Sequence, residues 1–275
     1  MSKTWFITGA SSGFGRLMTE RLLERGDRVV ATVRRDRVLD ALQRMHGDSL
    51  AVLKLNLTET QAIGAAMREA FVRMGRVDVI VSNAGYGLVG AAEEVSDAQI
   101  ADQIATNLVG SIQLIRSALP HLRQQGGGRI IQLASEGGQI AYPNFSIYHA
   151  TKWGIEGFIE SVAQEVSSFG IDFIIAEPGP TATDFGAGLV HGTPMEVYAD
   201  TAAGAVRRAL SEGTFDVRGD AGKTVDAMIA AADSESAPFR LTLGSRAYQS
   251  ITSALATRLR ALEAQRDVAY GADAD

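Results

Sequence analysis

The start of the chain holds the feature that most restricts its fold, a strand that passes through a glycine-rich turn directly into a helix. Residues 4–8 are a short, apolar, β-rich run, and glycines follow at positions 9, 13 and 15. Apolar residues at helical spacing predict a helix over residues 16–25, and residues 28–33 read as a second strand. Strand, turn, helix and strand in this order form a βαβ unit, which contains a parallel pair of strands.

Strands and helices continue to alternate through the first two thirds of the chain. We predict further strands at residues 50–57, 77–82, 129–135 and 171–177, and helices at residues 37–45, 60–73, 98–119 and from Tyr148 to about residue 169. This alternation indicates an α/β fold of the Rossmann type, a doubly wound parallel sheet flanked by helices. Because 46% of the 275 residues are hydrophobic and no linker or repeat divides them, we predict a single domain over residues 1–275.

The last third of the chain has a looser pattern, beginning at Asp184. Residues 185–194 are rich in glycine, and helices are predicted at residues 195–210 and 221–232. We expect a substrate lid in this region, around residues 184–235. An edge strand at residues 239–243 and an amphipathic helix at residues 247–260 follow, and we expect that helix to pack on the sheet.

Several short motifs follow predicted strands and should therefore meet in space. The glycine turn, residues 83–85, Ser135 and residues 178–179 each stand where a strand ends. Ligands of doubly wound sheets bind beyond the carboxyl ends of the strands. We therefore expect one binding site along this edge.

The glycine turn is the candidate nucleotide site. Glycines allow a diphosphate to approach the backbone N–H groups at the start of a helix. The spacing Gly-x-x-x-Gly-x-Gly differs from the commoner Gly-x-Gly-x-x-Gly fingerprint, and such a turn could also be a simple connection. The βαβ context favours nucleotide binding.

The residues after the second strand predict which cofactor binds. Val33 ends that strand, and Arg34 and Arg35 follow it where a carboxylate would select NAD(H). An arginine there pairs with the 2′-phosphate of NADP(H). We predict a preference for NADP(H) over NAD(H), with Arg34 as the main ligand and Arg35 as a weaker candidate; two solvated surface arginines are the alternative.

Ser135, Tyr148 and Lys152 form a candidate catalytic group. Tyr148 and Lys152 are four residues apart, so they share one face of the predicted helix. A free tyrosine has a pKa of about 10, and we expect the ammonium of Lys152 to lower the pKa of Tyr148 by favouring the phenolate. Tyr148 could then act as acid and base while the Ser135 hydroxyl holds a substrate oxygen. The alternative is a tyrosine at the rim of the fold beside a solvated lysine.

Composition argues against several other classes of function. The net charge of −6 argues against a nucleic-acid-binding surface, and no apolar run approaches the ~20 residues of a membrane span. The chain has no cysteine, which rules out disulfides and thiolate chemistry, and no signal-peptide pattern precedes the first strand. We therefore expect a cytoplasmic protein with no nucleic-acid or membrane partner, and we predict no metal site.

In order and spacing, these motifs resemble those of the short-chain dehydrogenase/reductases. The resemblance covers nearly the whole chain and is best over residues 4–185. The motifs that carry it are residues 8–15, residues 83–85, Asn107, Ser135, Tyr148, Lys152 and residues 178–179. Residues 83–87, 177–179 and 183–185 look like the 17β-hydroxysteroid dehydrogenase-like branch of that family.

The resemblance implies an enzyme that interconverts a small-molecule carbonyl and an alcohol by hydride transfer with a nicotinamide cofactor. It implies that Tyr148 is the acid–base group, that Lys152 lowers its pKa and binds the nicotinamide ribose, and that Ser135 bonds the substrate oxygen. Asn107 would support a water that links Lys152 to solvent, although taken alone it reads as a buried hydrogen-bonding residue. With the two arginines, the predicted cofactor-binding positions are Gly9, Ser12, Gly13, Phe14, Gly15, Arg34, Arg35, Asn56, Leu57, Asn83, Ala84, Gly85, Tyr148, Lys152, Pro178, Gly179, Thr181 and Thr183.

Two positions depart from the family pattern. Asn56 stands where an aspartate is usual beside the adenine, so we expect an altered affinity, and Ser82 stands where many members have asparagine. Family members commonly assemble through the helices that carry Asn107 and Tyr148, so we expect a homodimer or homotetramer. The residues expected to border the substrate are Leu88, Glu136, Gln139, Tyr142 and residues 185–197, with Tyr142, Phe185, Leu189 and Met195 as an apolar wall.

Two other functions are weighed against this one. A non-catalytic NADP(H)-binding regulator would use the same fold, but its signature would be a broken Asn/Ser/Tyr/Lys set, and here the set is intact. A sugar-nucleotide epimerase or dehydratase usually has a different glycine spacing and a longer substrate domain.

Overall fold

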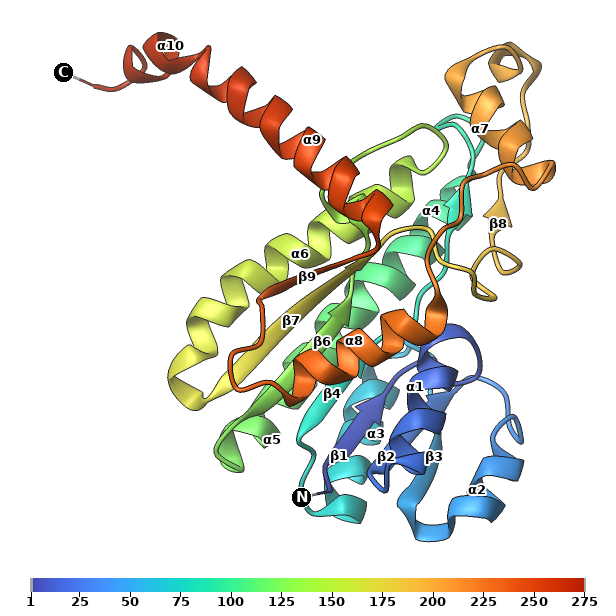
Figure 1. Ribbon diagram of the computed structural model, residues 1–275, viewed down its shortest axis with the longest axis vertical. Coiled ribbons are helices and arrows are strands. Elements are labelled where there is room, and N and C mark those ends of the chain that lie inside the picture. Colours follow the sequence, from blue (N-terminus) through green and yellow to red (C-terminus); the bar gives the residue numbers. More distant parts are fainter. Residues whose placement is uncertain (1, 275) are drawn as a thin grey trace.

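One parallel sheet runs through the molecule (Figure 1). The computed structural model describes residues 2–274, so the first and last residues of the predicted domain lie outside it. Within that range, seven strands lie in the order β3–β2–β1–β4–β6–β7–β9. They are β1 (Thr4–Ile7), β2 (Arg28–Val33), β3 (Leu50–Lys54), β4 (Val79–Ser82), β6 (Gly128–Leu133), β7 (Ile171–Pro178) and β9 (Arg240–Leu243). The predicted doubly wound α/β fold is confirmed.

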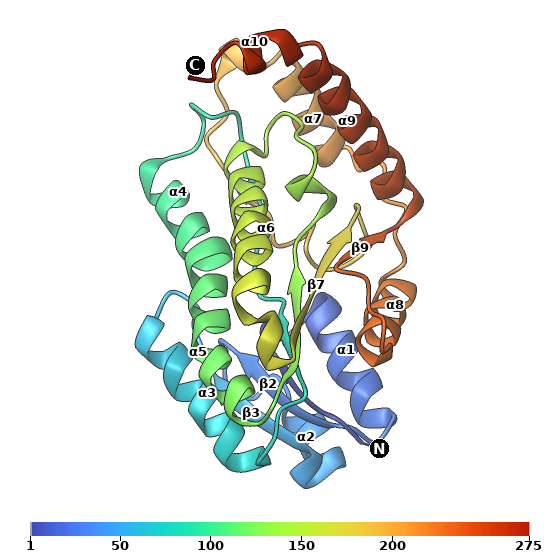
Figure 2. The same cartoon turned by 90° about the vertical axis from the view of Figure 1, so that its left-hand side faces the viewer.

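Helices cover both faces of this sheet (Figure 2). On one face lie α3 (Thr60–Met74), α5 (Gly110–Gln124) and α6 (Ser146–Val166). On the other face lie α1 (Gly13–Glu24), α2 (Asp40–His46) and α8 (Ala221–Asp233). Each face is a separate apolar core, so the strands between them are buried on both sides, and their sequences read as continuous apolar runs.

The strand order reverses between β1 and β4, in the middle of the sheet. The chain winds outward from β1 to β3 in one direction and from β4 to β9 in the other. At such a reversal the connecting loops leave in opposite directions, which opens a crevice at the carboxyl ends of the strands. The glycine turn after β1 and residues 83–85 after β4 border this crevice.

The helix predicted over residues 98–119 is interrupted. The chain forms α4 (Asp97–Ile104), a π-helical turn (Ala105–Val109) and then α5. A Cβ atom on Gly110 would lie 2.8 Å from the Cβ of Leu57, so the helix passes unusually close to the loop after β3. The widened turn lies directly before this close approach and contains Asn107, whose side chain bonds the backbone of another loop.

Two short strands hold the glycine-rich segment of residues 185–194 against the chain that follows β4. β5 (Leu88–Val89) pairs in parallel with β8 (Val190–His191). In addition, the N–H of Gly192 donates to the carbonyl of Val89 at 2.8 Å. A helix, α7 (Ala202–Ser211), begins later than predicted because Thr201 caps it through the N–H of Gly204.

The C-terminal part of the predicted lid, which forms α8, belongs to the core. In α8, Val225 and Met228 are fully buried against the sheet and α1. Only the part of the range before α8 borders the crevice.

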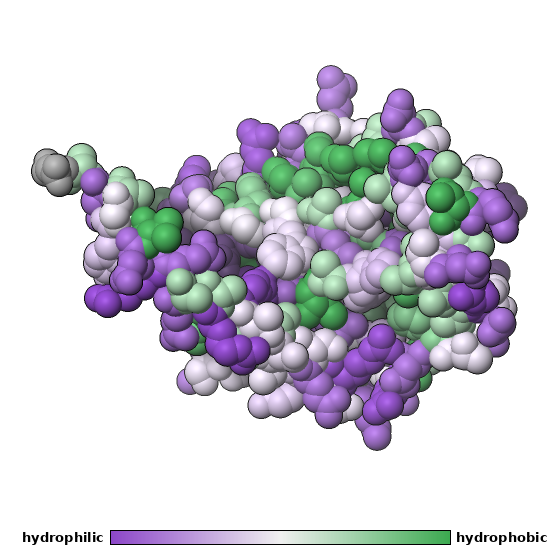
Figure 3. All heavy atoms as spheres, turned by 90° about the horizontal axis from the view of Figure 1, so that it is seen from above, coloured by the Kyte–Doolittle hydropathy of each residue, from purple (hydrophilic) through white to green (hydrophobic). Residues whose placement is uncertain are grey.

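The prediction that the last helix packs on the sheet holds only for its first two turns. In α9 (Ser245–Glu263), Ala247 and Ile251 are buried, but the helix then projects from the body and is continued by α10 (Arg266–Tyr270) (Figure 1). Leu255 and Leu259 are 48% and 55% exposed. The reason is geometric: β9 is the last strand of the sheet, so no strand lies beneath the later turns. Seen from above, the arm extends beyond the body, with single apolar side chains among hydrophilic ones (Figure 3).

Among residues 2–274, no helix combines the length and the apolar character needed to cross a bilayer.

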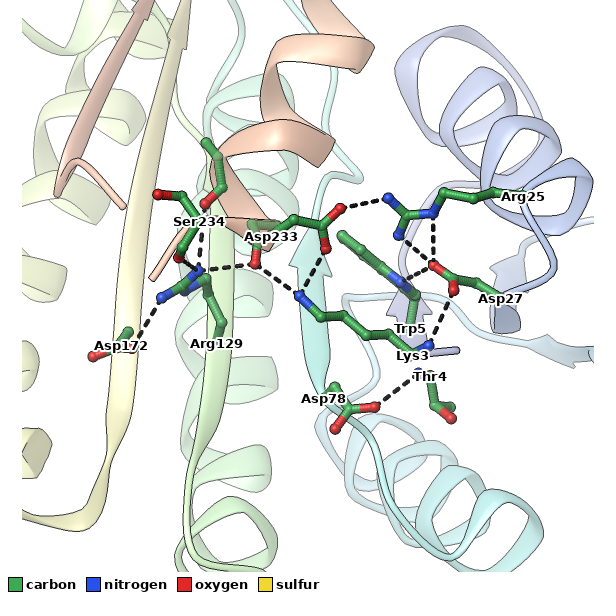
Figure 4. A network of polar contacts seen from close by, with 12 residues as sticks. Lys3, Thr4, Trp5, Arg25, Asp27, Asp78, Arg129, Asp172, Asp233 and Ser234 are labelled. Carbon is green, nitrogen blue, oxygen red and sulfur yellow. Dashed lines mark hydrogen bonds and ion pairs between the residues drawn. The ribbon is translucent and has the colours of Figure 1, made fainter. Parts of the chain in front are cut away.

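A polar network joins the amino ends of the strands to the end of α8 (Figure 4). The Arg129 guanidinium donates to the carbonyls of Ala232 at 2.8 Å and Ser234 at 2.7 Å, and so satisfies orphan carbonyls at the end of that helix. Lys3 pairs with Asp233 at 2.7 Å.

Asp27 is the buried centre of the other half of this network. It is 4% exposed, and its carboxylate accepts from the indole N–H of Trp5 at 2.9 Å and the backbone N–H of Lys3 at 3.0 Å. Arg25 pairs with the same carboxylate. Asp27 therefore adds side-chain bonds to the backbone pairing of β1 with β2.

Replacing Asp27 should destabilise the fold through Trp5. Asp27→Ala leaves a fully buried indole N–H without an acceptor, which costs about 1–3 kcal/mol in the free energy of unfolding. Asp27→Asn keeps one carbonyl oxygen as an acceptor, so its free energy of unfolding should fall by less. Urea unfolding followed by tryptophan fluorescence measures both values. Equal stability of Asp27→Ala and the unaltered protein would contradict this role.

Candidate active site

A cavity of about 800 Å³ lies at the carboxyl edge of the sheet, along the crevice. It is bordered by the loops that follow β1, β2, β3, β4, β6 and β7. The predicted site residues that line it are Gly9, Ser12, Gly13, Phe14, Arg34, Asn56, Leu57, Asn83, Ala84, Gly85, Ser135, Tyr148, Lys152, Pro178, Gly179, Thr181 and Thr183. Gly15, Arg35 and Asn107 are the predicted site residues that do not line it.

Asn83 holds the glycine turn in shape. Its side-chain amide donates to the carbonyls of Thr8 at 2.8 Å and Gly9 at 3.3 Å. The hydroxyl of Thr8 in turn accepts from the backbone N–H groups of Asn83 at 2.9 Å and Ala84 at 3.0 Å. A Cβ atom on Gly15 would lie 2.5 Å from both the Asn83 amide and the Gly9 carbonyl, so Gly15 is a packing position beneath the turn.

The start of α1 can accept an anion. The helix begins at Gly13, earlier than predicted, and its first turn carries no acidic side chain. The positive end of the helix and its free N–H groups therefore face the cavity. A carboxylate oxygen of Asp184 accepts from the N–H of Gly13 at 3.4 Å, so a negatively charged group already lies at this position.

The two candidate arginines differ in position. Arg34 lines the cavity and Arg35 does not. Asp36, the nearest carboxylate in the sequence, pairs with Lys54 at 2.8 Å on the exposed surface. At the end of β3, Asn56 bonds Glu59 at 3.2 Å and accepts from the N–H of Thr58 at 3.2 Å.

Ser135, Tyr148 and Lys152 come together at the other end of the cavity, and each is at least nine-tenths buried. The ammonium of Lys152 lies 5.5 Å from the centroid of the Tyr148 ring and donates to the carbonyl of Leu133 at 2.7 Å. The hydroxyl of Ser135 accepts from the N–H of Gly137 at 3.1 Å. The alternative of a rim tyrosine beside a solvated lysine is therefore wrong.

The expected lowering of the Tyr148 pKa is not found in the chain alone. Burial raises the pKa of Tyr148 to about 12, with a further increase from Glu136 and a partial decrease from the Ser135 hydroxyl. Burial likewise lowers the pKa of Lys152 to about 8, against the opposing charge of Glu156. The physical reason is that burial removes both side chains from water and favours their neutral forms, while the Lys152 ammonium donates to a main-chain carbonyl instead of the phenol. Desolvation is therefore the dominant effect on both groups.

Asn107 is a buried residue that bonds the backbone. Its side-chain oxygen accepts from the N–H of Tyr86 at 3.1 Å, and its amide donates to the carbonyl of Tyr86 at 2.8 Å. It is 3% exposed. A Cβ atom on Gly85 would lie 3.1 Å from the same side-chain oxygen, so the loop after β4 is fitted closely to the π-helical turn.

The substrate end of the cavity agrees with the sequence expectation only in part. Tyr142, Phe185 and Leu189 line it as expected. The expected residues that do not line it are Leu88, Gln139, Ala187, Val190 and residues 192–197, among them Met195. Gln139 instead donates to Glu177 at 2.9 Å, beneath the loop.

The sequence analysis missed part of this wall. Leu210 lies at the end of α7, and Phe215 and Val217 lie in the segment that leads to α8. Phe145, at the start of α6, also lines the cavity. These residues belong to no sequence motif, and only the tertiary structure shows that they lie at the cavity.

The residues of the chain match a known family model. The model described as short chain dehydrogenase matches residues 3–193. The chain is 33% identical over 279 aligned residues to Oxidoreductase calM of Penicillium decumbens, which covers 94% of this chain and 90% of that protein. It is 38% identical over 180 residues to Oxidoreductase BOA17 of Botryotinia fuckeliana, which covers 65% of this chain and 66% of that protein.

A solved structure shares the whole architecture. A short-chain dehydrogenase from Streptomyces avermitilis superposes with a TM-score of 0.90 at 36% sequence identity. The superposition covers 99% of this chain and 98% of that one. The regions after residue 193, including the projecting arm, are therefore part of a shared chain path.

Glu136 should make the stability of the protein depend on pH. Its carboxylate is buried, and neither oxygen has a hydrogen-bond partner within residues 2–274. Burial raises its pKa above the unfolded value, with Arg246 opposing. The contribution of Glu136 to stability is therefore greatest below about pH 4.3, where this group is protonated in both the folded and the unfolded state, and is lost as pH rises through the folded pKa.

Glu136→Gln should remove this dependence. The neutral variant should be more stable than the unaltered protein at about pH 8, by roughly 1 kcal/mol or more, and the difference should shrink toward about pH 4. Urea unfolding across this range measures the difference, with the same substitution at the exposed Glu24 as control. A constant difference at all pH values would contradict the prediction.

Proposed function

Since the chain belongs to the short-chain dehydrogenase/reductase family, we propose that it interconverts a carbonyl and an alcohol with NADP(H), using Ser135, Tyr148, Lys152 and Asn107. It is a nicotinamide-dependent oxidoreductase of that family. The observation that carries the proposal is the shared cavity, which has Ser135, Tyr148 and Lys152 at one end and the glycine turn with Arg34 at the other.

The shape and chemistry of the cavity fit a dinucleotide. At Gly13 an added Cβ atom would meet only Thr183, 3.8 Å away, so a diphosphate has room to approach the start of α1. The N–H of Gly13 donates there to the carboxylate of Asp184 at 3.4 Å, which a bound diphosphate would displace. A cavity of about 800 Å³ suits a cofactor with a small substrate. We assign the diphosphate to the glycine turn and the nicotinamide to the end near Pro178 and Thr183. When bound, the cofactor supplies or accepts the hydride.

The chain's own residues handle charge and protons at the reacting oxygen. With a pKa of about 12, Tyr148 holds its proton at neutral pH and can donate it to a carbonyl that gains negative charge. The Ser135 hydroxyl is a second donor aimed at the same charge. Lys152 would bind the nicotinamide ribose, and the positive charge would then favour the phenolate left on Tyr148.

The side chain of Asn107 holds the π-helical turn against the loop after β4. Both polar atoms of its side chain are engaged by Tyr86. We propose that Asn107 supports, from within this turn, the water that links Lys152 to solvent.

The remaining proposals concern the lid, assembly and location. We propose that the segment between Asp184 and Val217 forms the substrate lid, because it is largely exposed and lines the substrate end of the cavity. A homodimer or homotetramer would form on the faces of α5 and α6, where Leu119, Pro120 and Phe158 border a shallow groove. A cytoplasmic location would suit a chain without cysteine.

Tyr148→Phe should abolish turnover while leaving NADPH binding nearly unchanged. The phenyl ring keeps the packing but removes the proton that neutralises the developing oxyanion. NADPH oxidation followed by absorbance over cyclohexanone, benzaldehyde, phenanthrenequinone and estrone gives turnover, and NADPH fluorescence gives affinity. Activity above about a tenth of the unaltered enzyme would exclude Tyr148 as the acid–base group. Tight NADPH binding without turnover of any compound would favour a non-catalytic regulator.

Arg34→Ala should weaken NADPH binding by about tenfold or more and leave NADH binding within about threefold, because only NADPH carries the 2′-phosphate. Arg35→Ala is the matched control, since that residue lies outside the cavity lining and should have a much smaller effect. Dissociation constants come from cofactor fluorescence titrations. An equal loss for both cofactors would show that Arg34 does not read the phosphate.

A further inference from the structure

His149, the residue after Tyr148 on α6, is buried and has no part in the proposed chemistry. It is 5% exposed. Its Nδ1 lies 2.8 Å from the carbonyl of Gly137, and its Nε2 accepts from the backbone N–H of Tyr142 at 3.3 Å. Both ring nitrogens therefore bond the loop that connects β6 to α6.

These two partners determine the state of the imidazole. A carbonyl can only accept, so Nδ1 must carry a hydrogen, and a backbone N–H can only donate, so Nε2 must be unprotonated. The ring is therefore a neutral Nδ1–H tautomer. An imidazolium would place a second donor against the N–H of Tyr142.

One of the two bonds leads directly to Ser135. Gly137 receives the His149 hydrogen at its carbonyl and donates its own N–H to the Ser135 hydroxyl at 3.1 Å. Since that hydroxyl oxygen already accepts a bond, its own hydrogen is free to point into the cavity. A Cβ atom at position 137 would lie 2.7 Å from Nδ1, so only a glycine permits this contact.

The other bond leads to the substrate wall. Tyr142 lines the cavity, and its backbone N–H is held by Nε2 of His149. The two rings also pack edge to face, with centroids 4.5 Å apart and an interplanar angle of 90°. One side chain thus fixes both the polar end and the apolar wall of the site.

We infer that His149 is a positioning residue that orients the Ser135 hydroxyl through Nδ1 and anchors Tyr142 through Nε2. The inference rests on the proposed role of Ser135 in catalysis. The two ring nitrogens would then have different functions. The donor Nδ1 affects the chemical step through Ser135, and the acceptor Nε2 affects substrate binding through Tyr142.

The tautomer is tested first and needs no substrate. The ¹⁵N NMR spectrum of the ring nitrogens, recorded at about pH 8, should show the His149 ring as neutral with hydrogen on Nδ1. His149→Asn identifies which of the four histidines gives the signal. Hydrogen on Nε2 would overturn the inference, whatever the enzyme's activity.

Three substitutions then separate the two bonds. His149→Asn keeps a donor near the position of Nδ1, His149→Gln places an acceptor near that of Nε2, and His149→Phe keeps a ring without either. We expect His149→Phe to lower kcat by about tenfold or more, with His149→Asn recovering most of kcat and His149→Gln recovering KM instead. Equal kcat losses in the Asn and Phe variants would overturn the inference. If the Phe variant does not fold, His149→Asn and His149→Gln are compared with each other. A higher kcat in the Asn variant supports the inference, and equal kcat values in the two variants would overturn it.

Two controls complete the test, using the compound in the panel that is turned over fastest. His121→Asn, at a histidine that stacks on Phe71 away from the cavity, should leave kcat and KM unchanged. Combining His149→Phe with Ser135→Ala should lower kcat by little more than Ser135→Ala alone, because the two residues act in series. Full additivity would overturn the link to Ser135. If Ser135→Ala and Tyr148→Phe both leave turnover intact, the proposed catalytic set itself fails, while the NMR result still tests the tautomer.

Discussion

The contact between Thr8 and Asn83 is the constraint on which the rest of the site depends. These residues follow the two strands at which the sheet reverses its direction of winding, and they exchange side-chain and backbone hydrogen bonds. The bonds fix the glycine turn against the loop after β4, and this closeness explains why Gly9 and Gly15 have no room for a side chain. The start of α1 then faces the crevice. Asn83 therefore acts first as a structural support, whatever else it contacts.

Much of this architecture can be predicted from the sequence, because strands buried on both faces read as apolar runs such as residues 28–33 and 171–177. Their order along the chain then places the loops. Tyr148 and Lys152 are predictable in the same way, since helical spacing alone puts them on one face. These features depend on neighbours in the sequence or on the general topology of a parallel sheet.

The features that the sequence did not predict all depend on distant contacts. Strands of two residues, such as β5 and β8, are too short to leave a periodic pattern. The π-helical turn lies directly before the close approach of Gly110 to Leu57, and the high pKa of Tyr148 follows from burial and from the nearby Glu136. The projecting arm follows from the position of β9 at the edge of the sheet. Each requires the tertiary structure before it can be argued.

The cavity is built from two stretches of the chain. The family match ends at residue 193, and the glycine turn, Ser135, Tyr148 and Lys152 all lie before it. Leu210, Phe215 and Val217 lie after it, yet they form a wall of the same space. Substitutions in this second part can reshape the pocket without touching the Thr8–Asn83 contact or the proton donors. A duplicated gene could therefore acquire a new substrate through substitutions in this segment alone, which is about two dozen residues long.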